Sequence, residues 1–225
     1  MSRAFNFSVG EYYHVFNRGV EKRTIFNNLR DKERFQKLLY LCNGTKVVHL
    51  SVLGNLVESE ALYSVDRGEP LVAVGAYCLL NSHFHLLMKE HKSGGISRFM
   101  QKLSTAYTMY FNIRNQRTGS LFENRFRAKH AKSNEYLKYL FAYIHLNPVQ
   151  HIEPNWKEEG IKNFEKVWRY TTQYPFSSLP DYLGANRSNK SILSITEFPS
   201  YFRDKGSMSL ELQDWLTLKL AETDY

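Results

Sequence analysis

The chain has 225 residues, of which 43% are hydrophobic and 15% aromatic, so it can bury a sizeable core. The longest apolar run, Val72 to Leu80, is less than half of the roughly 20 residues that a membrane-spanning helix needs, and the N-terminus lacks a signal-peptide pattern. The net charge of +8 favours an anionic partner. We expect nucleic acid rather than a membrane, because neither a long basic amphipathic helix nor a lipidation motif is present. A cytoplasmic protein is the expectation from the lack of a spanning segment and of a signal pattern.

Composition indicates the domain organisation, and cysteine spacing indicates the state of the two thiols. We expect one main domain over residues 1–150 and a C-terminal extension over residues 151–225 that packs on the same domain. Within the extension, residues 186–191 have the composition of a linker and residues 209–221 predict a short helix. The two cysteines are Cys42 and Cys78. Both lie in apolar patterns and lack the spacing of a zinc site or redox pair, so we expect them to be buried, reduced and structural.

The first elements are predicted from two different periodicities. Residues 11–17 alternate, with Tyr12, His14 and Phe16 on one face, and this alternation predicts a strand. Residues 31–42 carry apolar side chains at helical spacing with charges between them. They predict a surface helix that packs on a sheet.

An irregular excursion separates this helix from a predicted hairpin. The pattern is weak over residues 43–70, where residues 47–56 are compatible with a strand and the remainder is mostly polar and turn-prone. Residues 71–80 and 82–89 then predict two strands joined by a tight turn at Asn81-Ser82.

A long helix and a basic segment follow the hairpin. Residues 96–115 form the longest helical pattern, and residues 121–131 predict a basic strand or ribbon. From Lys89 to Lys132 there are ten Lys or Arg residues and two acidic residues, Glu90 and Glu123. Charge runs usually lie on a solvated surface, but this one is interleaved with aromatic residues, as a groove that tracks phosphates and stacks bases requires. The residues predicted to contact nucleic acid are Asn17, Arg18, Lys22, Arg23, Arg98, Lys102, Arg125, Arg127 and Lys129.

The next predicted helix carries a stripe of tyrosines. Ser133 is a suitable N-cap, and Pro148 disfavours helical geometry at the residue before it, so the helix should end near residue 146. One stripe carries Tyr136, Tyr139, Tyr143 and Asn147. His145 lies two residues from Tyr143 and points away from that stripe, which makes it a poor candidate ligand.

Two histidines stand two residues apart in the second strand of the predicted hairpin. In a strand, His83 and His85 project from one face, whereas Phe84, Leu86 and Met88 project from the other and pack under a helix. Two converging ring nitrogens most simply hold a divalent metal. The alternative is that one or both are hydrogen-bonded core histidines, which for an isolated His-x-His we favour by roughly three to one.

The predicted tyrosine helix favours a metal site over a pair of core histidines. A tyrosine one turn before an amide residue and facing two histidines supplies a nucleophile and metal ligands for phosphodiester transesterification. Tyr143 is the expected nucleophile, chosen among fifteen tyrosines for its spacing to Asn147. His83, His85 and the side-chain oxygen of Asn147 would hold one Mg²⁺ or Mn²⁺ and leave positions for a phosphate oxygen and water. The product would be a 5′-phosphotyrosine with a free 3′-hydroxyl. The alternative is that Tyr143 is an ordinary tyrosine on an apolar helix face.

Five stretches in this order resemble the HUH-type single-tyrosine (IS200-like) transposases, and most closely the branch of REP-associated tyrosine transposases. They are residues 13–19 (YHVFNRG), 81–87 (NSHFHLL), 119–126 (GSLFENRF), 143–149 (YIHLNPV) and 174–178 (YPFSS). The resemblance implies that His83 and His85 are the metal pair, Tyr143 the nucleophile and Asn147 the third ligand. It also implies single-stranded or hairpin DNA as the partner, and a monomer or homodimer.

The resemblance further implies an α+β fold. We expect a ferredoxin-like antiparallel sheet with helices packed on one face and the histidine pair on a central strand. The sequence departs from the family where Asn81-Ser82 replaces a proline that commonly precedes the histidine motif. The excursion over residues 43–70 is longer than expected, and the tail after residue 186 has no counterpart.

Two alternative functions fit the same motifs. One is a nickase of the relaxase or replication-initiator kind on the same fold. The other is a domesticated DNA-binding protein, specific for a sequence or a hairpin, that keeps the site without transposition. Covalent capture of a labelled oligonucleotide separates an enzyme from a binding protein.

Overall fold

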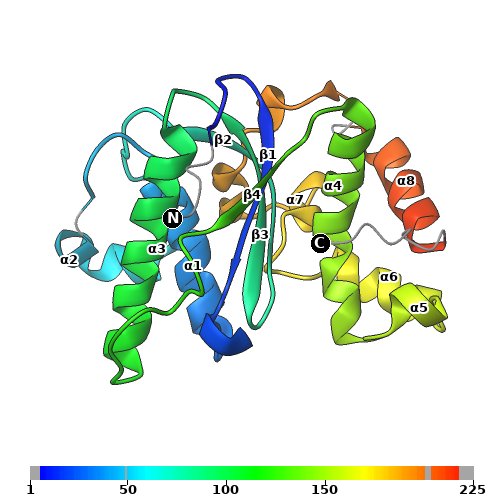
Figure 1. Cartoon of the computed structure of the whole chain (residues 1–225), viewed down its shortest axis with the longest axis horizontal. Coiled ribbons are helices and arrows are strands. Elements are labelled where there is room, and N and C mark those ends of the chain that lie inside the picture. The colour runs from blue at the N-terminus through cyan, green and yellow to red at the C-terminus, as the bar shows by residue number, and fades with distance from the viewer. Residues whose placement is uncertain (1–5, 49, 201–203, 218–225) are drawn as a thin grey trace.

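The computed structural model describes residues 6–48, 50–200 and 204–217, and an antiparallel sheet of order β2-β3-β1-β4 runs through its centre (Figure 1). The strands are β1 (Tyr12–Arg18), β2 (Val72–Leu79), β3 (His83–Glu90) and β4 (Arg127–His130). Helix α1 (Leu29–Cys42) connects β1 to β2, and α3 (Gly95–Arg114) connects β3 to β4. This is the predicted ferredoxin-like α+β arrangement, with the histidine pair on a central strand.

The register of the central strands decides which side chains share a face. The β2–β3 hairpin turns at Asn81 and Ser82, as predicted. On the neighbouring pair, Phe16 of β1 stands opposite His85 of β3, and Arg18 stands opposite His83. Directly opposed residues project to the same side of a sheet. The face that carries the histidine pair, called the histidine face below, therefore also carries alternate residues of β1.

The opposite face of the sheet is apolar and is covered by α1 and α3. Phe84 lies against Phe35 of α1, with 4.9 Å between their ring centroids. Leu86 and Met88 are fully buried on the same side, as the alternation predicted. Burial of each such side chain contributes about 1.5–3 kcal/mol, so this layer anchors the sheet.

A buried carboxylate fixes the start of α3. Glu90 accepts hydrogen bonds from the backbone N–H groups of Gly95 (3.0 Å) and Ile96 (2.8 Å). Its negative charge at the helix N-terminus is favourable. Gly94 has a φ of 77°, and a Cβ on Gly95 would lie 2.3 Å from the carbonyl oxygen of Leu71. Both positions therefore require glycine.

Helix α4 (Asn134–Leu146) covers the histidine face, so helices lie on both faces of the sheet rather than on one (Figure 1). A ferredoxin-like unit covers only one face with its two crossover helices, and the buried strand residues of the other face need a second layer. Ser133 caps α4 as predicted, since its hydroxyl accepts a hydrogen bond from the N–H of Tyr136. Pro148 marks its end, where the chain continues as the 3₁₀ helix η4 (Asn147–His151).

The excursion contains no strand among its described residues, so the prediction for residues 47–56 was wrong there. The segment forms α2 (Leu50–Leu53) and the 3₁₀ helices η2 (Gly54–Glu58) and η3 (Glu60–Ser64). A strand needs a free sheet edge, but residues 176–178 already lie along β2 and hydrogen bond to the backbone of Tyr77 and Leu79. The excursion packs beside α1 instead.

The basic ribbon predicted over residues 121–131 is a paired strand only in β4. The preceding loop is held by Asn17, whose side-chain amide donates hydrogen bonds of 2.9 Å to the carbonyl oxygens of Asn124 and Arg125. Beyond this loop the pairing resumes only as an isolated bridge between Gly19 and Phe122, next to a hydrogen bond from the N–H of Glu123 to the carbonyl oxygen of Arg18.

The C-terminal extension consists of short helices. They are α5 (Trp156–Glu159), α6 (Phe164–Thr172), α7 (Leu179–Tyr182), η5 (Ser188–Ile192), η6 (Ile195–Glu197) and α8 (Lys205–Thr217); the 3₁₀ turn η1 (Val20–Lys22) follows β1. Element η5 occupies most of the predicted linker and contacts α1, and α8 contacts α4. Helix α8 begins about one turn before the prediction, and residues 218–221 of that prediction lie outside the described residues. Cys42 and Cys78 are buried free thiols, as predicted. No helix in the described ranges is long and apolar enough to cross a membrane.

Candidate active site

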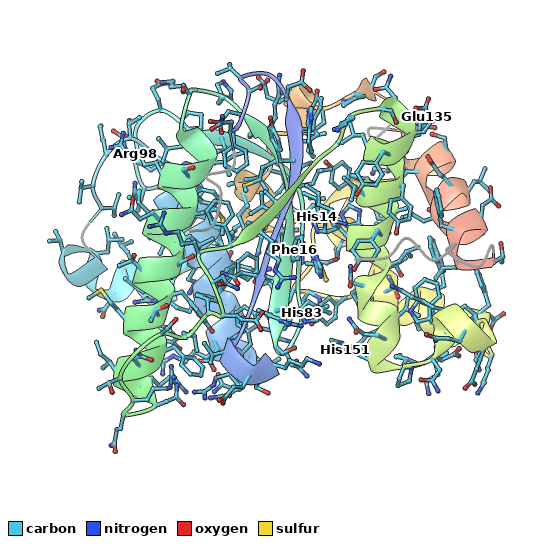
Figure 2. All side chains as sticks on the ribbon, viewed as in Figure 1. His14, Phe16, His83, Arg98, Glu135 and His151 are labelled. Carbon is cyan, nitrogen blue, oxygen red and sulfur yellow. The ribbon has the colours of Figure 1, made fainter. Side chains whose placement is uncertain are left out.

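Three histidines from two adjacent strands form the floor of a site on the histidine face. His83 and His85 lie on one side of β3 with 5.1 Å between their ring centroids, as the alternation predicted. His14 of β1 stacks on His85 at 5.0 Å, and its Nε2 lies 2.8 Å from Nδ1 of His85. Figure 2 shows His14, Phe16 and His83 in the layer between the sheet and α4.

Burial keeps these imidazoles neutral. It lowers the pKa of His14 to about 3, with a smaller effect from the nearby charge of Lys129. It also lowers the pKa of His83 to about 4, and that of His85 falls well below 6.5, with His14 and His83 as further causes. Neutral imidazole has a free lone pair on one ring nitrogen, which is the form that binds a metal.

The ring nitrogens fit an open metal site. Nδ1 of His83 lies 3.1 Å from the hydroxyl oxygen of Ser82, and Nδ1 of His85 is paired with His14. Nε2 of His85 is buried and has no hydrogen-bond partner in the described part of the chain. An unpaired buried polar atom is costly, and a cation at this nitrogen would satisfy it. Within residues 6–48, 50–200 and 204–217, no three His, Cys, Asp or Glu side chains are grouped to hold a metal alone.

Tyr143 of α4 faces the histidines. Its ring centroid lies 5.5 Å from that of His85 and 5.9 Å from that of His14, with the rings steeply inclined in both pairs. Tyr139 stacks on Tyr143 at 5.9 Å, and Tyr136 stacks on Tyr139 at the same distance. The predicted tyrosine stripe is therefore confirmed, and Tyr143 is the member that touches the imidazoles.

The phenol of Tyr143 is held in its protonated form. Burial raises its pKa to about 12 and Tyr139 adds to the effect, whereas a hydrogen bond with the side chain of Asn147 opposes it. Nζ of Lys157 lies 5.1 Å from the Tyr143 ring centroid, and burial lowers the pKa of that ammonium group. Ionisation of the phenol near neutral pH therefore needs further positive charge at the site.

The two polar residues at the end of α4 have different environments. The side-chain amide of Asn147 donates a hydrogen bond of 2.7 Å to the carbonyl oxygen of Tyr143, so Asn147 is tied to the tyrosine one turn before it. A role for its oxygen as a metal ligand stays a prediction. His145 points away and is buried with its Nε2 2.7 Å from the hydroxyl oxygen of Ser178, in agreement with its exclusion as a ligand.

Three of the predicted nucleic-acid contacts share the histidine face. The β1–β4 register places Arg127 opposite Phe16 and Lys129 opposite His14. Arg18 stands opposite His83 on the other neighbouring strand. Its guanidinium forms an ion pair with Glu123, with 2.6 Å between Nε and the carboxylate.

The other predicted contacts are not assembled around the histidines. Arg98 lies on α3, across the sheet (Figure 2). Lys102, on the same helix, donates a hydrogen bond of 2.6 Å to the carbonyl oxygen of Gly44. Asn17 is buried and holds the loop before β4. Lys22 and Arg125 are exposed and Arg23 is half-buried. Their roles in binding DNA stay predictions.

Sequence reasoning missed three polar residues that border the site. His14 lies on the predicted face of the first strand, but its pairing with His85 depends on strand order, which no local signal gives. Lys157 and His151 lie after Pro148 in a stretch with mixed periodicity. The pKa of His83 is lowered first by burial and then by the nearby His151.

Comparison with known proteins supports the family resemblance. Residues 69–147 match the family model described as IS200-like transposase, and this segment contains the histidine pair, Tyr143 and Asn147. The match confirms the predicted resemblance over these residues. A solved structure of a REP-associated tyrosine transposase bound to a REP hairpin aligns with 13% identity and a TM-score of 0.49, covering 84% of this chain and 89% of that chain. Comparison with curated proteins finds no match.

Proposed function

We propose that this protein, which matches the IS200-like transposase model over residues 69–147, is a metal-dependent single-strand DNA endonuclease and transesterase that cleaves and rejoins DNA. The observation that carries the proposal is the contact of Tyr143 with His85, at 5.5 Å between ring centroids, beside a buried and unpaired Nε2. The proposed nucleophile and two neutral imidazoles meet there on elements that are more than fifty residues apart in the chain.

In the proposed reaction, the hydroxyl oxygen of Tyr143 attacks a phosphorus atom of the DNA backbone. The bond between that oxygen and phosphorus forms, and the bond from phosphorus to the 3′ oxygen breaks. The phenol loses its proton, and the departing 3′ oxygen gains one. The product is a 5′-phosphotyrosine with a free 3′-hydroxyl, and rejoining is the same step in reverse with a 3′-hydroxyl as the nucleophile.

The chain's own residues supply position and charge for this step. Stacking on Tyr139 restricts the Tyr143 ring, and the ammonium group of Lys157 against that ring favours the phenolate. His83 and His85, with Asn147 as a proposed third ligand, would hold Mg²⁺ or Mn²⁺. When bound, this cation supplies the positive charge that polarises the phosphate.

The proposed partner is single-stranded or hairpin DNA. Arg127 and Lys129 lie on the histidine face, where they can contact phosphates of a strand bound there. We assign the catalytic domain to residues 1–150 and an extension to residues 151–225 that packs on it. The extension contributes to the site through Lys157.

Covalent capture tests the proposal. The protein is incubated with labelled single-stranded and hairpin oligonucleotides and Mg²⁺, and adducts are separated under denaturing conditions. We expect a denaturant-resistant band that Tyr143→Phe abolishes, because the variant lacks one oxygen and little packing. Tyr139→Phe, the matched control on the same helix, should retain the band.

Two outcomes would contradict the proposal. A band that survives Tyr143→Phe and disappears in Tyr139→Phe would show that another tyrosine attacks. DNA binding without an adduct on any oligonucleotide would favour the alternative of a DNA-binding protein that has kept the site without its chemistry.

A further inference from the structure

The pair formed by His14 and His85 has an arrangement that the proposed reaction does not use. His14 Nε2 and His85 Nδ1 lie 2.8 Å apart, and both rings are buried. The outer nitrogens of the pair, Nδ1 of His14 and Nε2 of His85, are also buried and have no hydrogen-bond partner among the described residues. The pair therefore has one internal hydrogen bond and two unsatisfied ends.

We propose that His14 is a positioning residue that selects the ring tautomer of His85 and so directs the Nε2 lone pair of His85 to a divalent cation. The proposal rests on the metal site of the proposed function and assigns a role to a residue outside the expected ligand set. His14 itself does not touch the cation in this assignment.

The positions of the ring protons explain how His14 can select the tautomer of His85. Two neutral imidazoles that share one hydrogen bond have two arrangements. In the first, His14 donates from Nε2, so His85 carries its proton on Nε2 and cannot bind a cation there. In the second, His85 donates from Nδ1 to Nε2 of His14, and the Nε2 lone pair of His85 is free.

The two arrangements have similar costs without a cation. Each leaves one buried N–H group and one buried lone pair unsatisfied, because the unpaired ends exchange roles when the shared proton moves. A cation at Nε2 of His85 satisfies one end only in the second arrangement. Metal-binding histidines usually donate their other N–H to a carboxylate, a backbone carbonyl or water, and here an imidazole is the acceptor.

Packing holds the acceptor in place. Phe16 stacks on His14 with 4.9 Å between ring centroids, and His14 stacks on His85 at 5.0 Å. Both His14 and Phe16 belong to β1, which pairs with β3 along its length. The sheet therefore sets the distance between donor and acceptor before any ligand arrives.

Two substitutions of His14 separate positioning from packing. His14→Phe keeps a ring of similar size and removes the acceptor, whereas His14→Gln offers its side-chain oxygen near the position of Nε2. Co²⁺ is titrated into each purified full-length protein without DNA, and its absorption spectrum and affinity are measured. We expect Co²⁺ affinity about 10–100-fold weaker in His14→Phe, and within a few-fold of the parent in His14→Gln.

Equal affinity and an unchanged Co²⁺ spectrum in the parent and His14→Phe would overturn the proposal. Failure of His14→Gln to bind better than His14→Phe would also overturn it. If the parent binds no Co²⁺, both this proposal and the metal assignment of the proposed function fail. An adduct lost in Tyr143→Phe, together with equal Co²⁺ affinities, would instead leave the nucleophile intact and remove only the role of His14.

A nitrogen NMR measurement on the parent tests the proposed tautomer of His85 if His14→Phe does not fold. In the Zn²⁺-loaded protein, we expect the ring of His85 to carry its proton on Nδ1 and to bind the cation through Nε2. Coordination through Nδ1, or a proton on Nε2, would overturn the proposal.

Discussion

The two faces of the sheet are packed with rings of similar size, but one face is apolar and the other is polar. Under α1 and α3, Phe35 and Phe84 pack ring against ring at 4.9 Å. Under α4, His14, His85 and Tyr143 lie at similar spacings, but each carries a polar atom. An apolar layer stabilises without needing partners, whereas a buried polar layer needs a partner for every nitrogen and oxygen. The unsatisfied nitrogens of His14 and His85 lie on the second face, and there we expect a ligand.

Removal of divalent metal should have the largest effect on activity and should distinguish the two faces. It affects the histidine face and leaves the apolar face unchanged. We expect excess EDTA to abolish adduct formation, since two imidazoles and one amide are too few to hold a cation tightly. Added Mg²⁺ or Mn²⁺ should restore the adduct, and His83→Ala should not respond to either ion. Undiminished cleavage in EDTA would contradict the metal assignment.

Acid should destabilise the protein through its buried histidines. The pKa values of His14, His83 and His145 fall to about 3, 4 and 3, below the unfolded value near 6.5, so the unfolded chain binds more protons. The stability they contribute is present above pH 6.5 and is lost as the pH falls towards 4, by about 1.4 kcal/mol per pH unit for each group. Urea unfolding of the metal-free protein at pH 7.5 and 5.5 measures the loss. His145→Gln keeps a hydrogen-bonding side chain and should reduce the pH dependence, and an unchanged dependence would contradict this account.

Truncation on the apolar face should lower stability and spare the chemistry. We expect Phe35→Ala to reduce the free energy of unfolding by about 3–5 kcal/mol, because Phe35 is fully buried against Phe84 and Tyr107. Urea denaturation measures the change. Adduct formation by the folded fraction at low temperature should match the parent, and a specific loss of adduct would show that the two faces are coupled.

The smallest expected effect is on the salt dependence of DNA binding, and it distinguishes cationic residues on the two faces. Arg127→Gln should lower the slope of log affinity against log salt for single-stranded DNA by about 0.7, the value for one phosphate contact. Arg98→Gln, across the sheet on α3, is the matched control and should leave the slope unchanged if DNA binds on the histidine face alone. Equal changes in both variants would show that DNA also contacts α3.

Periodicity was sufficient where an element packs by one regular face. The alternation over residues 11–17 and the helical spacing over residues 96–115 predicted β1 and α3 to within one or two residues. Periodicity failed where tertiary contacts decide. Residues 47–56 look compatible with a strand, but no sheet edge is open to them because residues 176–178 already lie along β2.

The residues of the candidate site also fall into a group that local spacing predicts and a group that only tertiary contacts reveal. His83, His85 and Tyr143 could be selected from spacing within a single strand or helix, and the structure brings them together. His14 and Lys157 join them through strand order and through the fold of the extension. Such contacts join residues far apart in the chain, so spacing within one element does not contain them.

The protection of the sheet edges has a consequence for how this protein behaves at high concentration. The outer edge of β2 is covered by residues 176–178, whereas β4, the other edge, is only four residues long and carries Arg127 and Lys129. Exposed edge strands recruit further strands and aggregate, and charge repulsion on a short edge opposes this. We therefore expect the two cations to oppose pairing of β4 with another strand, and variants that neutralise both should be checked for self-association.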